Sequence, residues 1–205
     1  MDALAIADAL GMLGTSTVYE AAGKVGDMGP AIRQIVPGTR FAGLAVTVRV
    51  WPGDTLGVLR AIDTAVGGAV IVVDAGGTDR AAVWGGTSSL ACLARGVRAS
   101  VTNGSVRDVD EIIALKFPVY AAGVSPRGTL KNHPGWRGIP VSVGDCVVND
   151  GDIVIGDSDG VLIVPMKDAA EILVKAEAQE RKQLERDARA RAGESLVSII
   201  GLPKV

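Results

Sequence analysis

The segment 103–111, which reads Asn-Gly-Ser-Val-Arg-Asp-Val-Asp-Glu, concentrates the residue types best suited to chemistry in this chain. Asp108 and Glu111 are three positions apart, so in a helix they share one face. Carboxylates in a first helical turn are favoured by the helix dipole and can present oxygen to a hard cation. Arg107 adds a planar cation that can hold a carboxylate through two hydrogen bonds. The same spacing also suits acids that only decorate a helix start, with Arg107 paired to Glu111.

A second segment, 84–89, predicts an anion site. Small residues that run straight into a helix expose backbone N–H groups at its positive end, where a carboxylate or phosphate can bind. The glycines are not followed by lysine, so the segment is no Walker A loop, and it does not match G-x-G-x-x-G. A tight loop capped by Thr87 or Ser88 is the alternative. The candidate substrate-binding residues are Gly85, Gly86, Thr87, Ser88 and Arg107.

Alternating strands and helices are expected to position these two segments. Strands are predicted at 44–50, 69–73, 97–102 and 117–122, and helices at 55–66, 87–94 and 106–115, with a turn at Asn103-Gly104. This alternation predicts a parallel or mixed sheet with crossover helices. Both segments would then lie beyond the carboxyl ends of strands, where open α/β sheets bind ligands.

The two ends of the chain read differently from its middle. Helices are expected at 3–13 and 17–22, the second capped by Thr17, because Glu20 completes a capping box. Short strands are expected at 139–143, 152–155 and 161–164. A long charged helix follows and is stopped by Gly193. We expect one domain over residues 1–205, in which 168–201 form a C-terminal helical arm.

The composition excludes several classes of partner. A net charge of -2 gives no electrostatic case for binding nucleic acid or an anionic membrane. Cys92 and Cys146 form no C-x-x-C pair, which favours thiols in a reducing compartment. The first residues lack the basic region of a signal peptide, and the apolar run 69–73 is too short to span a bilayer. We therefore expect a cytoplasmic protein.

Motifs along most of the chain resemble one known family. The sequence is similar to the RraA-like family, which includes the regulator of RNase E activity and the 4-hydroxy-4-methyl-2-oxoglutarate aldolases. The matching segments are 30–33, 37–38, 43–48, 52–54, 72–74, 84–85, 94–97, 103–108, 156–161 and 193–196. The resemblance implies an αββα-type sandwich related to the swivelling phosphohistidine domain, and a homotrimer or hexamer.

The resemblance also implies an activity. Class II aldolases of this family cleave 4-hydroxy-4-methyl-2-oxoglutarate or 4-carboxy-4-hydroxy-2-oxoadipate to pyruvate and decarboxylate oxaloacetate. Carried onto this chain, the loop 85–88 and Arg107 would hold the small 2-oxo acid, and Asp108 would bind Mg²⁺ or Mn²⁺. Glu111 would orient a water that moves protons. The expected protein is thus a metal-dependent carbon-carbon lyase.

One position departs from the family pattern. The aldolases carry an acid twenty-one residues before the arginine, and here that position is Gly86. The absence of this acid should impair aldol cleavage more than decarboxylation. Asp54 and Asp79 are the candidate residues that could substitute for the acid. A Schiff-base lysine is a rival, although the lysines fall in polar loops or on exposed helix faces. A non-catalytic regulator that binds an RNA-processing enzyme such as RNase E is the second function.

Overall fold

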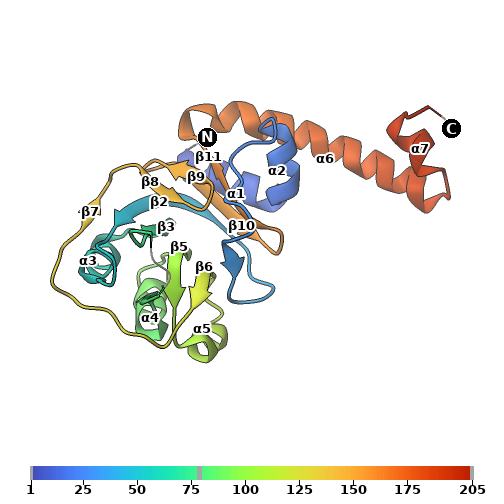
Figure 1. Cartoon of the computed structure of the whole chain (residues 1–205). Coiled ribbons are helices and arrows are strands. Elements are labelled where there is room, and N and C mark those ends of the chain that lie inside the picture. Colours follow the sequence, from blue (N-terminus) through green and yellow to red (C-terminus); the bar gives the residue numbers. More distant parts are fainter. Residues whose placement is uncertain (1, 78–79, 204–205) are drawn as a thin grey trace.

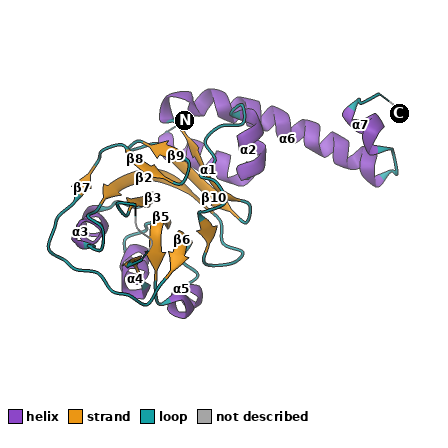
Figure 2. Cartoon of the chain, in the orientation of Figure 1, coloured by secondary structure: helices purple, strands orange, loops and turns teal. Residues whose placement is uncertain are grey.

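The computed structural model describes residues 2–77 and 80–203, and its centre is one large sheet (Figures 1 and 2). The strands follow the order β1-β6-β5-β3-β2-β10-β11, with β4 paired to β5 and β7 paired to β2. Neighbours β2, β3, β5 and β6 run parallel, whereas β1, β7, β10 and β11 pair antiparallel. The strand bounds are Arg33–Gln34 (β1), Phe41–Arg49 (β2), Ala69–Asp74 (β3), Ala82–Trp84 (β4), Ala99–Val106 (β5), Val119–Val124 (β6), Trp136–Arg137 (β7), Ile153–Asp157 (β10) and Gly160–Val164 (β11).

Helices and a small hairpin cover this sheet. Helices α3 (Leu56–Thr64), α4 (Gly86–Ala94) and α5 (Val109–Leu115) bury an aliphatic core with Ile71 and Val73 of β3. Because side chains alternate along a strand, Val70 and Val72 join a second core under the hairpin β8 (Val141–Val143) and β9 (Cys146–Val148). Every residue of β3 is buried, as its continuous apolar run predicts.

A third core joins the two ends of the chain. Helices α1 (Ala3–Leu13) and α2 (Thr15–Ala21) pack with β10, β11 and the start of α6 (Ala169–Arg191), which follows a short 3-10 turn, Met166–Asp168. The rest of α6 projects away from the body and carries α7 (Leu196–Ile200) at its tip (Figure 1). Arg189 and Glu194 close the turn between α6 and α7 with two side-chain hydrogen bonds, of 2.7 and 2.5 Å.

The mixed α/β fold with a nearly closed, barrel-like sheet and a C-terminal helix confirms the coarse fold class. The finer likeness to a swivelling phosphohistidine domain stays a prediction. Within residues 2–77 and 80–203, no helix is both long and apolar enough to cross a membrane.

The predicted cap of the second helix is wrong. Helix α2 begins at Thr15 rather than 17, and Thr17 lies inside it. Asp157, at the end of β10, accepts hydrogen bonds from the Thr15 amide at 2.9 Å and the Thr15 hydroxyl at 2.6 Å. The start of α2 is therefore satisfied by a carboxylate 142 residues away, which local sequence patterns cannot reveal.

The predicted turn at Asn103-Gly104 is also wrong. Strand β5 continues to Val106 with a register irregularity between Thr102 and Ser105, and α5 starts only at Val109 instead of 106. A short strand that the sequence patterns did not predict, β4, leads into the segment 84–89 and pairs parallel with the extended part of β5. This extra pairing brings the two candidate segments together.

Candidate active site

The two predicted segments leave the carboxyl ends of neighbouring strands. In the β4–β5 ladder, Trp84 is opposite Val106, so the next residues of each strand, Gly85 and Arg107, also lie close together. The Arg107 amide donates a hydrogen bond of 3.0 Å to the Trp84 carbonyl. The sheet itself therefore positions the start of α4 beside the start of α5, as ligand sites in α/β sheets require.

Asp108 occupies an unusual backbone conformation at the start of α5. Its φ of 57° and ψ of 40° lie in the left-handed region, which few non-glycine residues adopt. Such conformations cluster at functional sites, because the surrounding structure must hold them in place. The Asp108 Oδ2 accepts a hydrogen bond of 3.1 Å from the Gly86 amide and lies 3.6 Å from Arg107 Nε. Arg107 thus pairs with Asp108 and not with Glu111.

Gly85 is required by the closeness of this carboxylate. A Cβ added at position 85 would lie 2.6 Å from Asp108 Oδ2 and 3.3 Å from Arg107 Cγ. A side chain at position 85 would therefore have to displace the Asp108 carboxylate from its place beside the start of α4.

The start of α4 has no side-chain cap, so the predicted caps Thr87 and Ser88 do not form. Ser89 is the buried hydroxyl of this turn: it accepts a hydrogen bond of 2.9 Å from Trp84 Nε1 and donates one of 3.2 Å to the Gly85 carbonyl. Trp84 in turn stacks on Phe117, with ring centroids 6.1 Å apart. The first amide of α4, that of Gly86, binds Asp108, whereas among the described residues no oxygen accepts from the Thr87 and Ser88 amides, which favours an external anion at these two positions.

A cavity of about 500 Å³ opens beside this turn. Five of the predicted residues line it, namely Gly85, Thr87, Ser88, Arg107 and Asp108. Residues of α3 and of the segment after β6 also line it, and that segment contributes Gly128, Thr129 and Lys131. Lys131 was missed by sequence reasoning because it appeared as one lysine in a polar loop. No local pattern marks it, since the loop 125–135 comes to the cavity only through tertiary contacts.

Asp54 fastens this loop to the start of α3. Its Oδ2 accepts hydrogen bonds of 2.7 Å from the Asn132 amide and 3.1 Å from the His133 amide, and its Oδ1 accepts one of 2.8 Å from the Leu56 amide. Burial alone would raise the pKa of this carboxyl, but the three amides outweigh burial and lower it. Asp54 is only 2% exposed and fully engaged, so the prediction that it replaces the missing acid is wrong. Asp79, the other candidate, lies outside the described residues.

Asp54→Ala is expected to lower the free energy of unfolding by about 1–3 kcal/mol, because it leaves buried amides without an acceptor. The pKa of the folded carboxyl is depressed, so its stabilising effect is present above the ordinary aspartate value of 3.8 and is lost as the pH falls through the folded pKa. Urea unfolding at pH 7 and pH 3 measures both effects. The exposed Asp110→Ala is the control, and equal stability of the two variants at pH 7 would contradict the role of Asp54.

Two predicted residues, Gly86 and Glu111, are not among the residues that line the cavity. The Gly86 amide contacts Asp108, and a Cβ placed on Gly86 would overlap Oε2 of Glu111. The predicted sharing of one site by Asp108 and Glu111 thus takes the form of two carboxylates on either side of the Gly85-Gly86 turn.

The oxygen donors beside Asp108 suit a hard cation such as Mg²⁺ or Mn²⁺ and not an ion that requires several His or Cys ligands. Among the described residues, no group of three or more His, Cys, Asp or Glu side chains could hold a metal. The Asp108 side chain is 37% exposed, and its recorded contacts involve Oδ2, which leaves Oδ1 for a cation. Mg²⁺ is commonly held by one or two carboxylates and otherwise by water and substrate oxygens.

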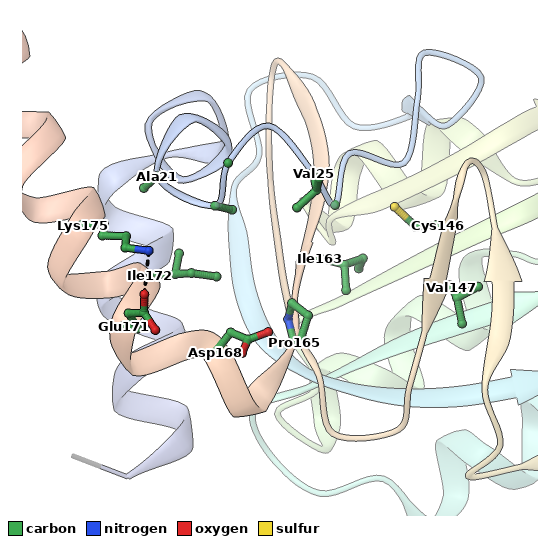
Figure 3. A pocket seen from close by; sticks show the side chains of 13 residues that line it. Ala21, Val25, Cys146, Val147, Ile163, Pro165, Asp168, Glu171, Ile172 and Lys175 are labelled. Atoms are coloured by element: carbon green, nitrogen blue, oxygen red, sulfur yellow. Dashed lines mark ion pairs between the residues drawn. The ribbon is translucent and has the colours of Figure 1, made fainter.

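A second hollow, of about 390 Å³, lies between α2, the β8–β9 hairpin and α6 (Figure 3). It contains none of the predicted site residues. Burial first, and then the nearby Asp27 and Asp145, raise the pKa of its Cys146 thiol to about 11. The thiol is therefore protonated at neutral pH and unsuited to nucleophilic chemistry.

The geometry can now be set beside known proteins. Residues 6–163 match the family described as "RraA-like: Aldolase/RraA". The chain belongs to the RraA-like family. It is 32% identical over 178 residues to the "Putative 4-hydroxy-4-methyl-2-oxoglutarate aldolase" of Halalkalibacterium halodurans, covering 87% of this chain and 83% of the relative.

Solved structures agree with this membership of the RraA-like family. An uncharacterized protein from Pseudomonas syringae pv. tomato has a TM-score of 0.82 at 28% identity, covering 95% of this chain and 96% of its own. The "RNA-processing inhibitor RraA from Thermus thermophilis" has a TM-score of 0.68 at 26% identity, covering 74% and 92%. Named relatives thus include both aldolases and an inhibitor of RNA processing.

Proposed function

We propose that this RraA-like protein is a divalent-metal-dependent carbon-carbon lyase that acts on small 2-oxo acids and releases pyruvate. One observation carries the proposal: Arg107, Asp108 and the uncapped start of α4 converge on one cavity of about 500 Å³. A carboxylate ligand, a guanidinium and free amides together suit a substrate with adjacent keto and carboxylate oxygens. The names of the aldolase relatives support the same reaction class.

Each residue has a distinct task in this proposal. The substrate carboxylate lies against the Thr87 and Ser88 amides, and Arg107 neutralises its charge. Asp108 would hold Mg²⁺ or Mn²⁺ through one carboxylate oxygen. The metal, when bound, supplies positive charge that draws electrons toward the keto oxygen as the C–C bond breaks. Glu111 orients a water that returns a proton to the substrate carbon.

Oxaloacetate decarboxylation needs the fewest groups. The C3–C4 bond breaks and C4 leaves as CO₂. The electron pair of that bond stays with the substrate and forms a C2–C3 double bond, so that negative charge develops on the C2 oxygen. Arg107 and the α4 amides stabilise the developing charge, and a proton added at C3 gives pyruvate. Lys131, which also lines the cavity, provides a second cation for the distal carboxylate of a dicarboxylic substrate. Aldol cleavage requires, in addition, a base for the substrate hydroxyl.

The direct test measures pyruvate release from oxaloacetate by the purified protein. With Mg²⁺ or Mn²⁺ present, release should exceed the rate of the metal ion alone by at least about 100-fold, and chelation with EDTA should remove the excess. Restoring the metal should restore the activity. Turnover that is equally fast with and without metal contradicts the proposal.

A regulatory role is the second candidate, and its support is the resemblance to the RNA-processing inhibitor. A protein that acts only by docking has no need for a carboxylate held in a left-handed conformation beside an arginine. Calorimetric titration with oxalate separates the two functions. The lyase should bind oxalate only when Mg²⁺ is present. A pure regulator should bind oxalate neither with Mg²⁺ nor without it.

A further inference from the structure

Gly86 and Glu111 are in contact across the start of two helices. A Cβ added at Gly86 would overlap Glu111 Oε2 and would lie 3.3 Å from both Cβ and Cδ of Glu111. The backbone of Gly86 does not adopt a positive φ. Glycine at position 86 therefore contributes the space left by a missing side chain and not an unusual backbone conformation. The Glu111 carboxylate occupies that space.

We propose that Gly86 and Glu111 act as one unit, in which α5 supplies to the site the acid that a longer residue at position 86 would otherwise supply. The inference rests on the proposed lyase function and assigns its proton-moving carboxylate. Gly86 links the two acids physically, because its amide binds Asp108 while its unsubstituted α-carbon faces Glu111. The two carboxylates therefore contact the same residue, Asp108 through the Gly86 amide and Glu111 through the Gly86 α-carbon.

The surroundings of Glu111 give it no competing structural task. It is the third residue of α5, the position from which a glutamate commonly reaches back to the first amide of its own helix. No such bond forms here, and among the described residues no hydrogen bond or ion pair engages its carboxylate. The side chain instead lies against the α-carbon of Gly86, the first residue of α4.

This arrangement predicts that a change at position 86 acts through Glu111. Gly86→Ala adds a methyl group where Oε2 now lies, so the carboxylate must move although every acid of the site remains. In Gly86→Asp/Glu111→Ala, the space is free, and the new aspartate places a carboxylate from α4 in the same region. The single variant therefore displaces the acid, whereas the double variant changes its origin and keeps its location.

The experiment compares Glu111→Gln, Glu111→Ala, Gly86→Ala, Gly86→Ala/Glu111→Gln and Gly86→Asp/Glu111→Ala with the wild type. Asp110→Asn, an acid of the same helical turn without contact to Gly86, is the control. Two quantities are measured, namely pyruvate release from oxaloacetate and the dissociation constant of Mn²⁺ alone, followed by electron paramagnetic resonance. Circular dichroism and thermal unfolding confirm that each variant is folded.

Glu111→Gln and Gly86→Ala should each reduce turnover by about 10²-fold, as expected for loss of a general acid or base. The double variant Gly86→Ala/Glu111→Gln should be no slower than either, because both changes remove one function. Gly86→Asp/Glu111→Ala should recover at least about 10-fold over Glu111→Ala. The variants with slower turnover should also have larger Mn²⁺ dissociation constants. Asp110→Asn should equal the wild type in both quantities.

The inference is overturned if folded Gly86→Ala matches the wild type, or if the exchanged variant is no better than Glu111→Ala. If Gly86→Ala does not fold, the comparison of Gly86→Asp/Glu111→Ala with Glu111→Ala decides by itself. A wild-type protein that releases pyruvate and binds Mn²⁺, with Glu111→Gln unchanged, refutes this inference and leaves the lyase function intact. A wild-type protein that does neither refutes both.

Discussion

Asp108→Asn is expected to reduce metal-dependent release of pyruvate by at least about 10³-fold, because the site loses the charge that holds its cation. Asparagine keeps the shape of the side chain, can still accept the hydrogen bond from the Gly86 amide, and tolerates the left-handed backbone of position 108. The free energy of unfolding should therefore change little. Steady-state kinetics with Mg²⁺ and thermal unfolding measure the two quantities.

Asp110→Asn provides the matched control for this change. It removes the same charge from the same helix, two positions along, at a residue that does not line the cavity. Its activity should equal that of the wild type. A comparable loss in both variants would mean that general charge on α5, and not a carboxylate at position 108, determines the rate.

Arg107→Ala is the change with the second largest expected effect, a fall of about 10²–10³-fold in kcat/KM for oxaloacetate. The guanidinium is expected to bind the substrate carboxylate and to stabilise charge that grows during bond breaking, so both KM and kcat should worsen. The Arg107–Asp108 pair is about half exposed, at 49% and 37%, and exposed ion pairs contribute little to stability. The variant should consequently remain folded.

Arg107→Lys distinguishes charge from geometry at this position. Lysine keeps the positive charge but cannot form the two parallel hydrogen bonds of a guanidinium. We expect it to recover only a small part of the lost kcat/KM. Full recovery would show that Arg107 acts as a simple counter-charge, and unchanged kinetics in Arg107→Ala would remove it from the site.

The helices and strands with strong local signals could be predicted from the sequence. The helix over 3–13 and the buried strand β3 appear as expected, because their apolar periodicity and length match the core that they enter. Local signals failed where a distant group decides the outcome. Asp157 replaces the expected cap of α2, and pairing with β4 extends β5 through an Asn-Gly pair that favours a turn in isolation.

The same division holds for the site. Sequence motifs identified Gly85, Thr87, Ser88, Arg107 and Asp108, since glycines before a helix and an Arg-Asp pair after a strand have recognisable chemistry. They could not identify Lys131, whose loop reaches the cavity because two of its amides bind the buried Asp54. They also suggested Asp54 as a spare acid, a role that its three hydrogen bonds exclude.

The sequence by itself determined the family, the aliphatic α/β core and most of the predicted residues that line the cavity, because these depend on local pattern and composition. Only the tertiary structure decided which groups are neighbours. The β4–β5 ladder joins the two segments, the left-handed backbone aims Asp108, and the space at Gly86 admits Glu111. Contacts of this kind join residues far apart along the chain, and their geometry follows from packing that no single segment encodes.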